Sequence, residues 1–466
     1  MYKKKFFFYL LIYQMVNILN KELLISYIDN YSTNISDKKK TGSVFTNSTL
    51  IDEMLNKLPA KVWKDETLKW LDTGCGIGNY HIIVYYKLME NIPIKDEEER
   101  RKHIIENMLY FIEYNTYYVN DLRNIFISDK YNLNIFNGSY FYLHTLEENI
   151  PIYNEETFGT EFNIILGNPP YQKINMKNPD KLSAKPLYHL FVKNSIDKLK
   201  EDGYLLYIHP VSWRRKSKEI KIINDILSKK LLYIYTNNAF TGFGTSAPYI
   251  NYYLLQNTLN DDKFLTKYET IFNNKKYEGK IHLNKKLEYI PVFLTKETIS
   301  IINKVINTGG KKFDVQLESK LSTEKKNISI NKDEEFKYLN LHTYSKKNGR
   351  IYRYSNKKHP CHDKLKIIMN FKGGHEYLKP FIDERTMGIT DNSMRLYVTD
   401  ENKDFLLSYF NSDILKFLLI CTTYNYGRNG KNEFHIINTF TMPKIQDFYK
   451  FYGITYKEIL FIRNLL

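Results

Sequence analysis

The feature that most constrains the fold is a short apolar run that ends in two consecutive prolines, at residues 162–171. The run Phe-Asn-Ile-Ile-Leu-Gly is typical of a parallel strand that is buried on both faces. It leads into Asn-Pro-Pro-Tyr, where the prolines cannot continue a ladder and hold the backbone extended. We therefore expect a stiff turn that presents an amide, a prolyl carbonyl and an aromatic ring at the carboxyl edge of a sheet, where ligands bind in open α/β folds.

Apolar segments of strand and helix length alternate on both sides of this run. We expect strands at 68–72, 108–112, 162–166, 203–209, 231–235 and 247–256, and helices at 80–89, 118–125, 186–199 and 220–228. Such alternation predicts βαβ units, and hence an α/β fold with a mostly parallel sheet and helices on both faces.

The alternation of strands and helices ends near residue 258, and lysine pairs, short strands and few long helices follow. One better-formed apolar helix is expected at 404–421. We predict three parts: an N-terminal extension and linker at 1–40, a catalytic domain at 41–258 and a mixed α+β domain at 259–466. The extension begins like a signal peptide, but it has no small-residue cleavage site and is too short to span a bilayer. We interpret it as an amphipathic helix or an extension from an upstream start.

The chain is strongly basic, because 68 Lys and Arg against 52 Asp and Glu give a formal net charge of +16. This charge favours a polyanionic partner or a membrane surface, although AT-rich coding accounts for a Lys-rich composition equally well. The 40 Tyr and 28 Phe interleave with Lys, which favours nucleic acid, since bases stack on aromatic rings. The 3 Cys are widely spaced, which indicates a reducing compartment and no disulfide framework.

A glycine-rich turn, Asp72-x-Gly74-x-Gly76-x-Gly78, follows the first expected strand and precedes a helix. Glycines at such a turn let the backbone approach a ligand closely. The spacing differs from G-x-G-x-x-G, so the turn alone indicates either a dinucleotide site or only a tight turn. Glu113 ends the next strand, where an acid suits the two hydroxyls of a ribose, as in NAD sites. By itself, Glu113 is better explained as a solvated strand end.

The Asn-Pro-Pro-Tyr corner offers two hydrogen-bond acceptors. The side-chain oxygen of Asn168 and the carbonyl of Pro169 together can grip a planar amine that has two N–H donors. Accepting both hydrogens pushes lone-pair density onto the nitrogen, and Tyr171 can stack on the ring that carries it. The pattern indicates a site that makes an exocyclic amine nucleophilic without a strong base. The alternative is a rigid proline turn that only closes a strand.

On these motifs the chain resembles S-adenosylmethionine-dependent adenine-N6 DNA methyltransferases of the gamma (TaqI-like) class, found among type II restriction-modification methylases. The resemblance covers residues 41–446 and is strongest over 68–256. It implies a Rossmann-like class I methyltransferase domain with a C-terminal β-hairpin, followed by a C-terminal target-recognition domain that binds DNA. Residues 41–55 resemble the N-terminal cofactor motif of this family, with Thr46 and Asn47 where Thr-Pro is usual.

The resemblance implies a role for each residue that matches a family motif. The residues implied in catalysis are Asn168, Pro169, Pro170 and Tyr171. Phe240 is implied in stacking on the target base. The residues implied in cofactor binding are Thr46, Asp72, Gly74, Gly76, Gly78, Glu113 and Ser139. Phe243 is the alternative stacking residue. Ser139 stands where the family usually has an Asp that contacts the adenine of the cofactor, so a weaker hydroxyl contact is expected there.

The implied reaction is methyl transfer from S-adenosyl-L-methionine to the exocyclic amine of an adenine flipped out of double-stranded DNA. The implied protein is a cytoplasmic monomer without membrane contact, and a companion restriction endonuclease is compatible with it. Two alternatives stay open. One is an RNA-base or protein-glutamine N-methyltransferase with the same Asn-Pro-Pro-Tyr motif, and the other is a non-catalytic DNA-binding protein on this scaffold. The long segment after the motif favours DNA.

Other polar clusters are less specific. His359, Cys361 and His362 lack a fourth ligand at a suitable spacing, so we expect no metal site. Arg214 and Arg215 follow a strand near the catalytic edge, where contact with phosphates and a solvated helix start are equally good interpretations. Residues 424–431 suit either a DNA-contacting loop or an ordinary polar loop.

Overall fold

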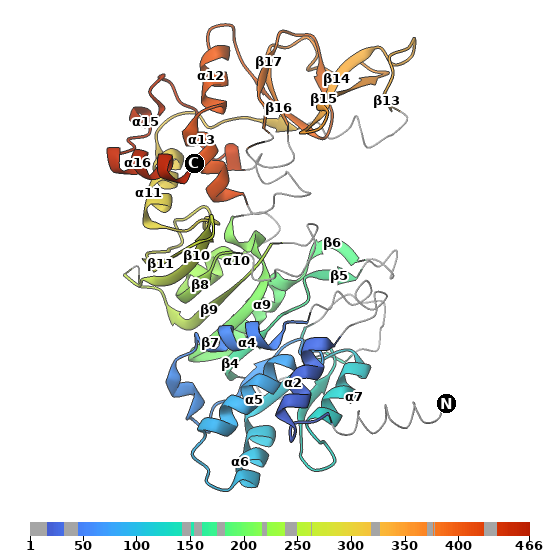
Figure 1. Ribbon diagram of the computed structural model, residues 1–466, viewed down its shortest axis with the longest axis vertical. Coiled ribbons are helices and arrows are strands. Elements are labelled where there is room, and N and C mark those ends of the chain that lie inside the picture. The colour runs from blue at the N-terminus through green and yellow to red at the C-terminus, as the bar shows by residue number, and fades with distance from the viewer. Residues whose placement is uncertain are drawn as a thin grey trace. The chain divides into compact units, whose positions relative to one another are not determined.

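The computed structural model describes residues 16–31, 45–141, 151–152, 161–174, 182–216, 221–237, 249–261, 263–317, 327–370, 376, 378–423 and 436–466 (Figure 1). The chain divides into two compact units. Unit 1 comprises Met1–Ala239, Ile250–Tyr268 and Lys280–Tyr289, and unit 2 comprises Phe240–Tyr249, Glu269–Gly279 and Ile290–Leu466. The assignment of catalysis to residues 41–258 and of target recognition to residues 259–466 stays a proposal, because compactness carries no information about function.

The main sheet is mostly parallel. Within the described residues it has nine strands, in the order β11-β10-β8-β9-β7-β4-β1-β2-β3. Their bounds are β1 Trp70–Asp72, β2 Leu109–Glu113, β3 Asn134–Asn137, β4 Phe162–Gly167, β7 Leu199–Pro210, β8 Lys229–Tyr235, β9 Ile250–Leu259, β10 Thr266–Phe272 and β11 Lys275–Ile281. Strands β3, β2, β1, β4 and β7 pair in parallel, whereas β9 is antiparallel to β7 and β8. The predicted α/β class is confirmed. Strands β8 and β9 form an antiparallel pair, but they do not end the sheet, because β10 and β11 continue it beyond β8.

Helices cover this sheet and bury apolar side chains. The helices of unit 1 are α2 Lys21–Asn30, α4 Ser48–Leu55, α5 Asn79–Asn91, α6 Glu97–His103, α7 Thr116–Ile125, α9 Tyr188–Lys198 and α10 Ile222–Leu227. The apolar run in β4 is buried at every position except Asn163, whose amide oxygen accepts a hydrogen bond from the backbone N–H of Lys69 at 2.9 Å. The continuous apolar run therefore forms the central strand that its sequence predicts.

Two local features of unit 1 differ from the sequence prediction. The N-cap of α4 is Asn47, whose side chain accepts from the backbone N–H of Leu50 at 2.9 Å. From the sequence alone, Thr46 or Ser48 is expected to cap this helix. That expectation is wrong, because neither side chain makes the capping contact. A short hairpin follows the prolines, formed by β5 Gln172–Ile174 and β6 Leu182–Pro186. Strands of this length carry too little alternation to be predicted.

Unit 2 has a mixed α+β structure with two sheets in its described part, of order β12-β19-β16-β17 and β13-β15-β14-β18. Its strands are β12 Gln316–Leu317, β13 Ile328–Ser329, β14 Tyr338–Ser345, β15 Gly349–Ser355, β16 Lys366–Asn370, β17 Phe381–Asp383, β18 Gly388–Ile389 and β19 Ser393–Tyr397. Its helices are α11 Lys296–Asn307, α12 Lys403–Phe410, α13 Asp413–Thr422, α15 Phe448–Phe451 and α16 Tyr456–Leu465. The predicted α+β character of this part is confirmed.

The single helix predicted at 404–421 is in fact two helices. Asn411 and Ser412 separate α12 from α13, and the two axes differ by 49°. The Ser412 hydroxyl accepts from the backbone N–H of Leu415 at 3.4 Å and begins the second helix. No single helix in the described parts of the chain is long and apolar enough to cross a membrane.

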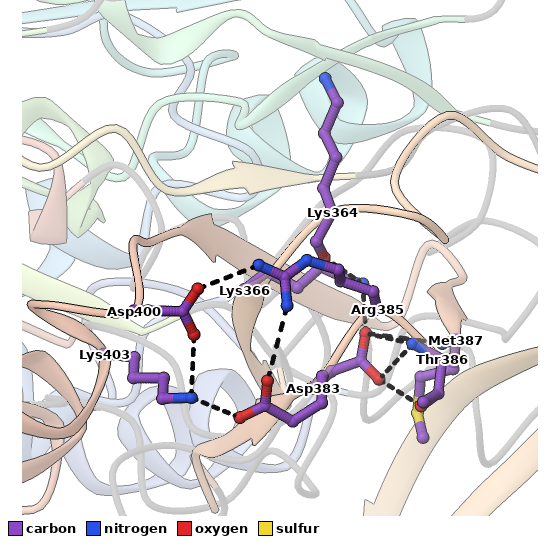
Figure 2. A network of polar contacts seen from close by, with 9 residues as sticks. Lys364, Lys366, Asp383, Arg385, Thr386, Met387, Asp400 and Lys403 are labelled. Atoms are coloured by element: carbon purple, nitrogen blue, oxygen red, sulfur yellow. Dashed lines mark hydrogen bonds and ion pairs between the residues drawn. The ribbon is translucent and has the colours of Figure 1, made fainter.

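A buried ion pair joins two strands of unit 2, as Figure 2 shows. Lys366 on β16 and Asp383 on β17 form this pair, and both side chains are 0% exposed. Asp383 also accepts from the backbone N–H of Thr386 at 3.1 Å, and Lys366 donates to the carbonyl oxygen of Lys364 at 3.0 Å. A buried charge is costly without such partners, so the pair holds the turn that leads into β18 in one arrangement.

Candidate active site

The loop after β1 forms one wall of the candidate site. Asp72 ends β1 with a buried side chain, and its Oδ1 accepts from the backbone N–H of Gly74 at 3.3 Å. Gly78 has φ +89° and precedes α5 as its N-cap. A Cβ added there would lie 2.6 Å from Cδ2 of Leu122, so only glycine fits this left-handed position against α7.

Glu113, at the end of β2, is joined directly to this loop. Its Oε2 accepts from the backbone N–H of Gly76 at 2.8 Å, and its Oε1 accepts from the backbone N–H of Asn115 at 2.9 Å. The acid is therefore no solvated strand end, because it is buried and accepts hydrogen bonds from the glycine turn. In the sequence, helices α5 and α6 lie between the glycine turn and Glu113. The parallel pairing of β1 with β2 brings the turn and the acid together.

Burial makes ionisation of the carboxyl groups of Asp72 and Glu113 unfavourable. Burial, with a smaller contribution from the nearby negative charge of Glu113, raises the pKa of Asp72 to about 8, against the lowering effect of the hydrogen bond from Gly74. Burial also raises the pKa of Glu113 to about 7, against the lowering effect of its backbone hydrogen bonds. No basic side chain of the described residues acts on either pKa. These two carboxyl groups therefore favour a ligand that brings positive charge or hydroxyl donors.

The Asn-Pro-Pro-Tyr turn lies against the same loop. Strand β4 pairs with β1 so that Asp72 faces Leu166, one residue before Gly167. Gly167 has φ +138°, and a Cβ added there would lie 2.6 Å from Oδ1 of Asp72. A Cβ added to Gly74 would lie 3.3 Å from Cδ of Pro170. The tetrapeptide and the glycine turn, far apart in the sequence, are therefore in contact.

Thr46 connects the segment before α4 to this corner. Its hydroxyl accepts a hydrogen bond from Nδ2 of Asn168 at 3.3 Å and one from the hydroxyl of Tyr80 at 3.3 Å. Its carbonyl oxygen accepts from Nδ2 of Asn79 at 2.9 Å. Because the Asn168 amide donates to Thr46, its Oδ1 is the part of the group that can accept from a substrate amine. Burial raises the pKa of the Tyr171 hydroxyl above its usual value, so that group stays neutral.

Two predicted residues have a more limited description. The Ser139 hydroxyl donates to the carbonyl oxygen of Phe141 at 2.7 Å. Its oxygen can still accept a hydrogen bond, which is the role expected of it toward an amine. Phe240, expected to stack on the target base, and its alternative Phe243 lie outside the described residues. The same holds for the polar segment at 424–431.

The contacts of two buried polar residues could not be predicted from the sequence, and one of these residues, Arg214, is no solvated helix start. Tyr207 on β7 shares a hydrogen bond of 2.6 Å with the hydroxyl of Thr73, although 134 positions separate the two residues. Arg214, considered as a phosphate contact, is buried and donates to the carbonyl oxygen of Thr236 at 2.9 Å. Neither contact repeats a motif or a short spacing, so only the fold reveals them.

The segment that carries both motifs has known relatives. Residues 28–243 match the Eco57I restriction-modification methylase family. A Mycoplasma pneumoniae protein described as an uncharacterized adenine-specific methylase is 28% identical over 182 residues, which cover 34% of this chain and 38% of that protein. The resemblance to adenine-specific restriction-modification methylases that the sequence motifs carry is thereby confirmed.

Two solved structures extend the likeness. The chain resembles LlaBIII, an ATP-dependent Type ISP restriction-modification enzyme bound to DNA, with a TM-score of 0.52 at 13% identity, over 97% of this chain and 41% of LlaBIII. It also aligns with the Type IIL restriction-modification enzyme MmeI in complex with DNA, with a TM-score of 0.49 at 10% identity, over 88% of this chain and 68% of MmeI. At these identities the likeness to LlaBIII concerns the fold alone. The chain spans less than half the length of LlaBIII and of the curated relative.

Proposed function

We propose that this chain is a site-specific DNA adenine-N6 methyltransferase that uses S-adenosyl-L-methionine. One observation carries the proposal: the Asn-Pro-Pro-Tyr turn packs against the glycine loop, with Pro170 next to Gly74. An amine held by Asn168 would thus lie beside a pocket suited to a nucleoside-containing cofactor. The family match over residues 28–243 supports the same reaction class.

The donor set of the pocket fits S-adenosylmethionine. That cofactor, when bound, supplies an activated methyl group on a positively charged sulfur. Asp72 and Glu113 are buried carboxyl groups without a basic partner among the described residues, and they would accept from its ammonium and hydroxyl groups. The glycine turn lets the backbone lie close to the ligand. Ser139 and Thr46 would complete the set of contacts.

The tetrapeptide would hold the acceptor. We propose that Oδ1 of Asn168 and the carbonyl of Pro169 would each accept one N–H of the adenine amine, which would concentrate lone-pair density on its nitrogen. Tyr171, with Phe240 opposite, would sandwich the flipped ring. Rate enhancement would come from orientation and from hydrogen bonds that strengthen as positive charge develops on the nitrogen.

We propose double-stranded DNA as the partner, with the segment after residue 258 as the part that reads it. Lysine pairs with exposed side chains recur in this segment, at 275–276, 311–312, 346–347 and 357–358. Such charges would contact phosphates, which fixes orientation on the duplex without reading sequence. Action as a monomer and association with a companion endonuclease belong to the same proposal.

The test replaces the amide that grips the amine. Methyl transfer from labelled S-adenosylmethionine to mixed-sequence duplex DNA is measured with the full chain, with Asn168→Ala and with Asn163→Ala. Loss of the acceptor in Asn168→Ala should reduce transfer by about 100-fold or more, as when one preorganised hydrogen-bonding group is removed from other active sites. Asn163 lies on β4, which ends one residue before Asn168, and its side chain accepts from the backbone N–H of Lys69, so Asn163→Ala should stay close to the unsubstituted rate.

The same assay separates the alternatives. Label that enters RNA or a protein in preference to DNA would contradict the DNA substrate while keeping the chemistry. Transfer to DNA that survives in Asn168→Ala within a few-fold of the unsubstituted protein would contradict the assignment of Asn168. Binding of DNA without binding of S-adenosylmethionine in calorimetry would favour the non-catalytic alternative.

A further inference from the structure

Four buried hydroxyl groups form a chain beneath the candidate site. Thr73 and Tyr207 share a hydrogen bond of 2.6 Å, Tyr207 and Ser195 one of 2.8 Å, and Ser195 and Tyr140 one of 3.3 Å. Each residue is at most 3% exposed, in the order Thr73 3%, Tyr207 0%, Ser195 0% and Tyr140 3%. A buried hydroxyl that loses its hydrogen-bond partner destabilises the folded protein. The series of four hydroxyl groups is therefore stable in only a narrow range of arrangements.

The two ends of the hydroxyl chain lie next to proposed cofactor contacts. Thr73 directly follows Asp72 in the loop after β1, and Tyr140 directly follows Ser139 in the loop after β3. The strands that carry these loops are separated by β2 in the sheet. The hydroxyl chain is therefore a second connection between the two loops, in addition to the backbone ladder of the sheet.

Tyr207 occupies the centre of this arrangement. Its register partner on β4 is Gly167, the residue before Asn168. Burial, and to a smaller extent the negative charge of Asp72, raises the pKa of the Tyr207 hydroxyl, so that group stays protonated. Its hydrogen bond to Thr73 places it one residue from Asp72. Tyr207 is fully buried, and it therefore acts on a ligand only through the residues that it contacts.

We propose that Tyr207 is a positioning residue, whose hydroxyl holds the loop after β1 and the loop after β3 at the separation that binds S-adenosylmethionine. The inference rests on the proposed function and adds a residue that no sequence motif contains. A positioning role differs from a purely structural role in one respect. Loss of the Tyr207 hydroxyl should weaken the cofactor complex more than it slows methyl transfer from cofactor that is already bound.

The experiment compares two tyrosine hydroxyls in unit 1. Tyr207→Phe removes the centre of the chain, and Tyr85→Phe removes a buried hydroxyl on α5 that accepts from Nε of Arg101 at 3.0 Å. Titration calorimetry with S-adenosylmethionine should give a Kd about three- to tenfold higher for Tyr207→Phe, the effect of losing one or two net hydrogen bonds. The Kd of Tyr85→Phe should be unchanged, although thermal unfolding should show similar losses of stability for both variants.

A split between kinetic constants gives the second readout. With Tyr207→Phe, the KM for S-adenosylmethionine should rise while kcat at saturating cofactor stays within about twofold, since ground-state and transition-state binding are weakened together. Thr73→Val should raise the Kd by a similar factor, and Thr73→Ser, which keeps the hydroxyl, should restore it. The double variant Thr73→Val with Tyr207→Phe should bind no more weakly than Tyr207→Phe alone, because Tyr207→Phe already removes the hydrogen bond to Thr73.

The outcomes separate this inference from the proposed function. Equal Kd values for the unsubstituted protein and Tyr207→Phe, or a fall in kcat with no change in KM, would overturn the positioning role and leave the proposed function standing. Additive effects in the double variant would also overturn it. Failure of the unsubstituted protein to bind S-adenosylmethionine would overturn the proposed function, and the inference with it.

Discussion

At the scale of single residues, Asp72 and Glu113 determine how the pocket responds to pH. Both carboxyl groups are buried, and burial raises their pKa values to about 8 and about 7, far above the value of about 4 in an unfolded chain. The folded protein therefore holds protons that the unfolded chain has already released. A cationic ligand would remove this cost, because it favours the ionised carboxylates.

We predict that the ligand-free protein loses stability as the pH rises from 6.5 to 8. A raised pKa in the folded state contributes stability that is fully present below the unfolded pKa and is lost as the pH rises through the folded pKa. The expected slope is about 1 kcal/mol per pH unit for Asp72, whose folded pKa lies at the top of this range. Chemical unfolding at a series of pH values measures it.

The buried histidines oppose this slope only toward the lower end of the pH range. Burial lowers the pKa of His81 and His209 to about 3, so their opposite contribution is still present near the unfolded value of about 6.5 and fades over about one pH unit above it. The slope is therefore read between about pH 7.5 and 8. Asp72→Asn is the control, since it removes the titrating group without changing its shape, and its slope should be flatter. Saturating S-adenosylmethionine should flatten the slope in the unsubstituted protein. An equally steep slope in Asp72→Asn would contradict this explanation.

At the scale of elements, the start of helix α4 is determined by local sequence and by tertiary contacts together. Three consecutive residues, Thr46, Asn47 and Ser48, can all cap a helix. The structure uses Asn47 as the cap, while the Thr46 hydroxyl accepts from Asn168 and Tyr80. Ser48 donates to the carboxylate of Asp29 instead. Propensity could not distinguish among them, because the choice depends on residues far away in the sequence.

Asn47→Ala should destabilise the protein by about 1 kcal/mol, the usual effect of losing an N-cap, and Asn47→Asp should be close to neutral. Because Thr46 adjoins the cap, we also expect Asn47→Ala to weaken S-adenosylmethionine binding, whereas Asn47→Asp should not. Thermal unfolding and calorimetry of the two variants provide the measurements. A weakened cofactor complex in Asn47→Asp would show that Asn47 acts on the ligand in some way other than by capping.

Periodicity sufficed to predict most elements of unit 1, because long apolar runs such as β4 have few alternative structures. It failed where an element is short or interrupted: the hairpin of β5 and β6 has too few residues, and Ser412 divides the predicted helix at 404–421. In the site, Asp72 and Asn168 could be selected from their motifs. Their close approach at Gly167 could not, since it depends on the register between β1 and β4.

At the scale of the whole molecule, the amine chemistry and the DNA substrate rest on different parts of the chain. The site in unit 1 accounts for an activated amine and a cationic cofactor. The proposal that the amine belongs to DNA depends on the basic segment after residue 258 and on a net charge of +16. The composition of the chain supports a DNA partner, but no motif predicts which DNA sequence is recognised. Recognition of bases depends on a few side chains in a particular geometry.

Methylated bases in the DNA of cells that express the chain test the central claim most directly. Single-molecule sequencing should find N6-methyladenine at one recurring sequence motif in cells that express the unsubstituted protein. Cells that express Asn168→Ala at the same level should show none above background. Absence of N6-methyladenine with a folded, cofactor-binding protein, or the same modification with Asn168→Ala, would contradict the account.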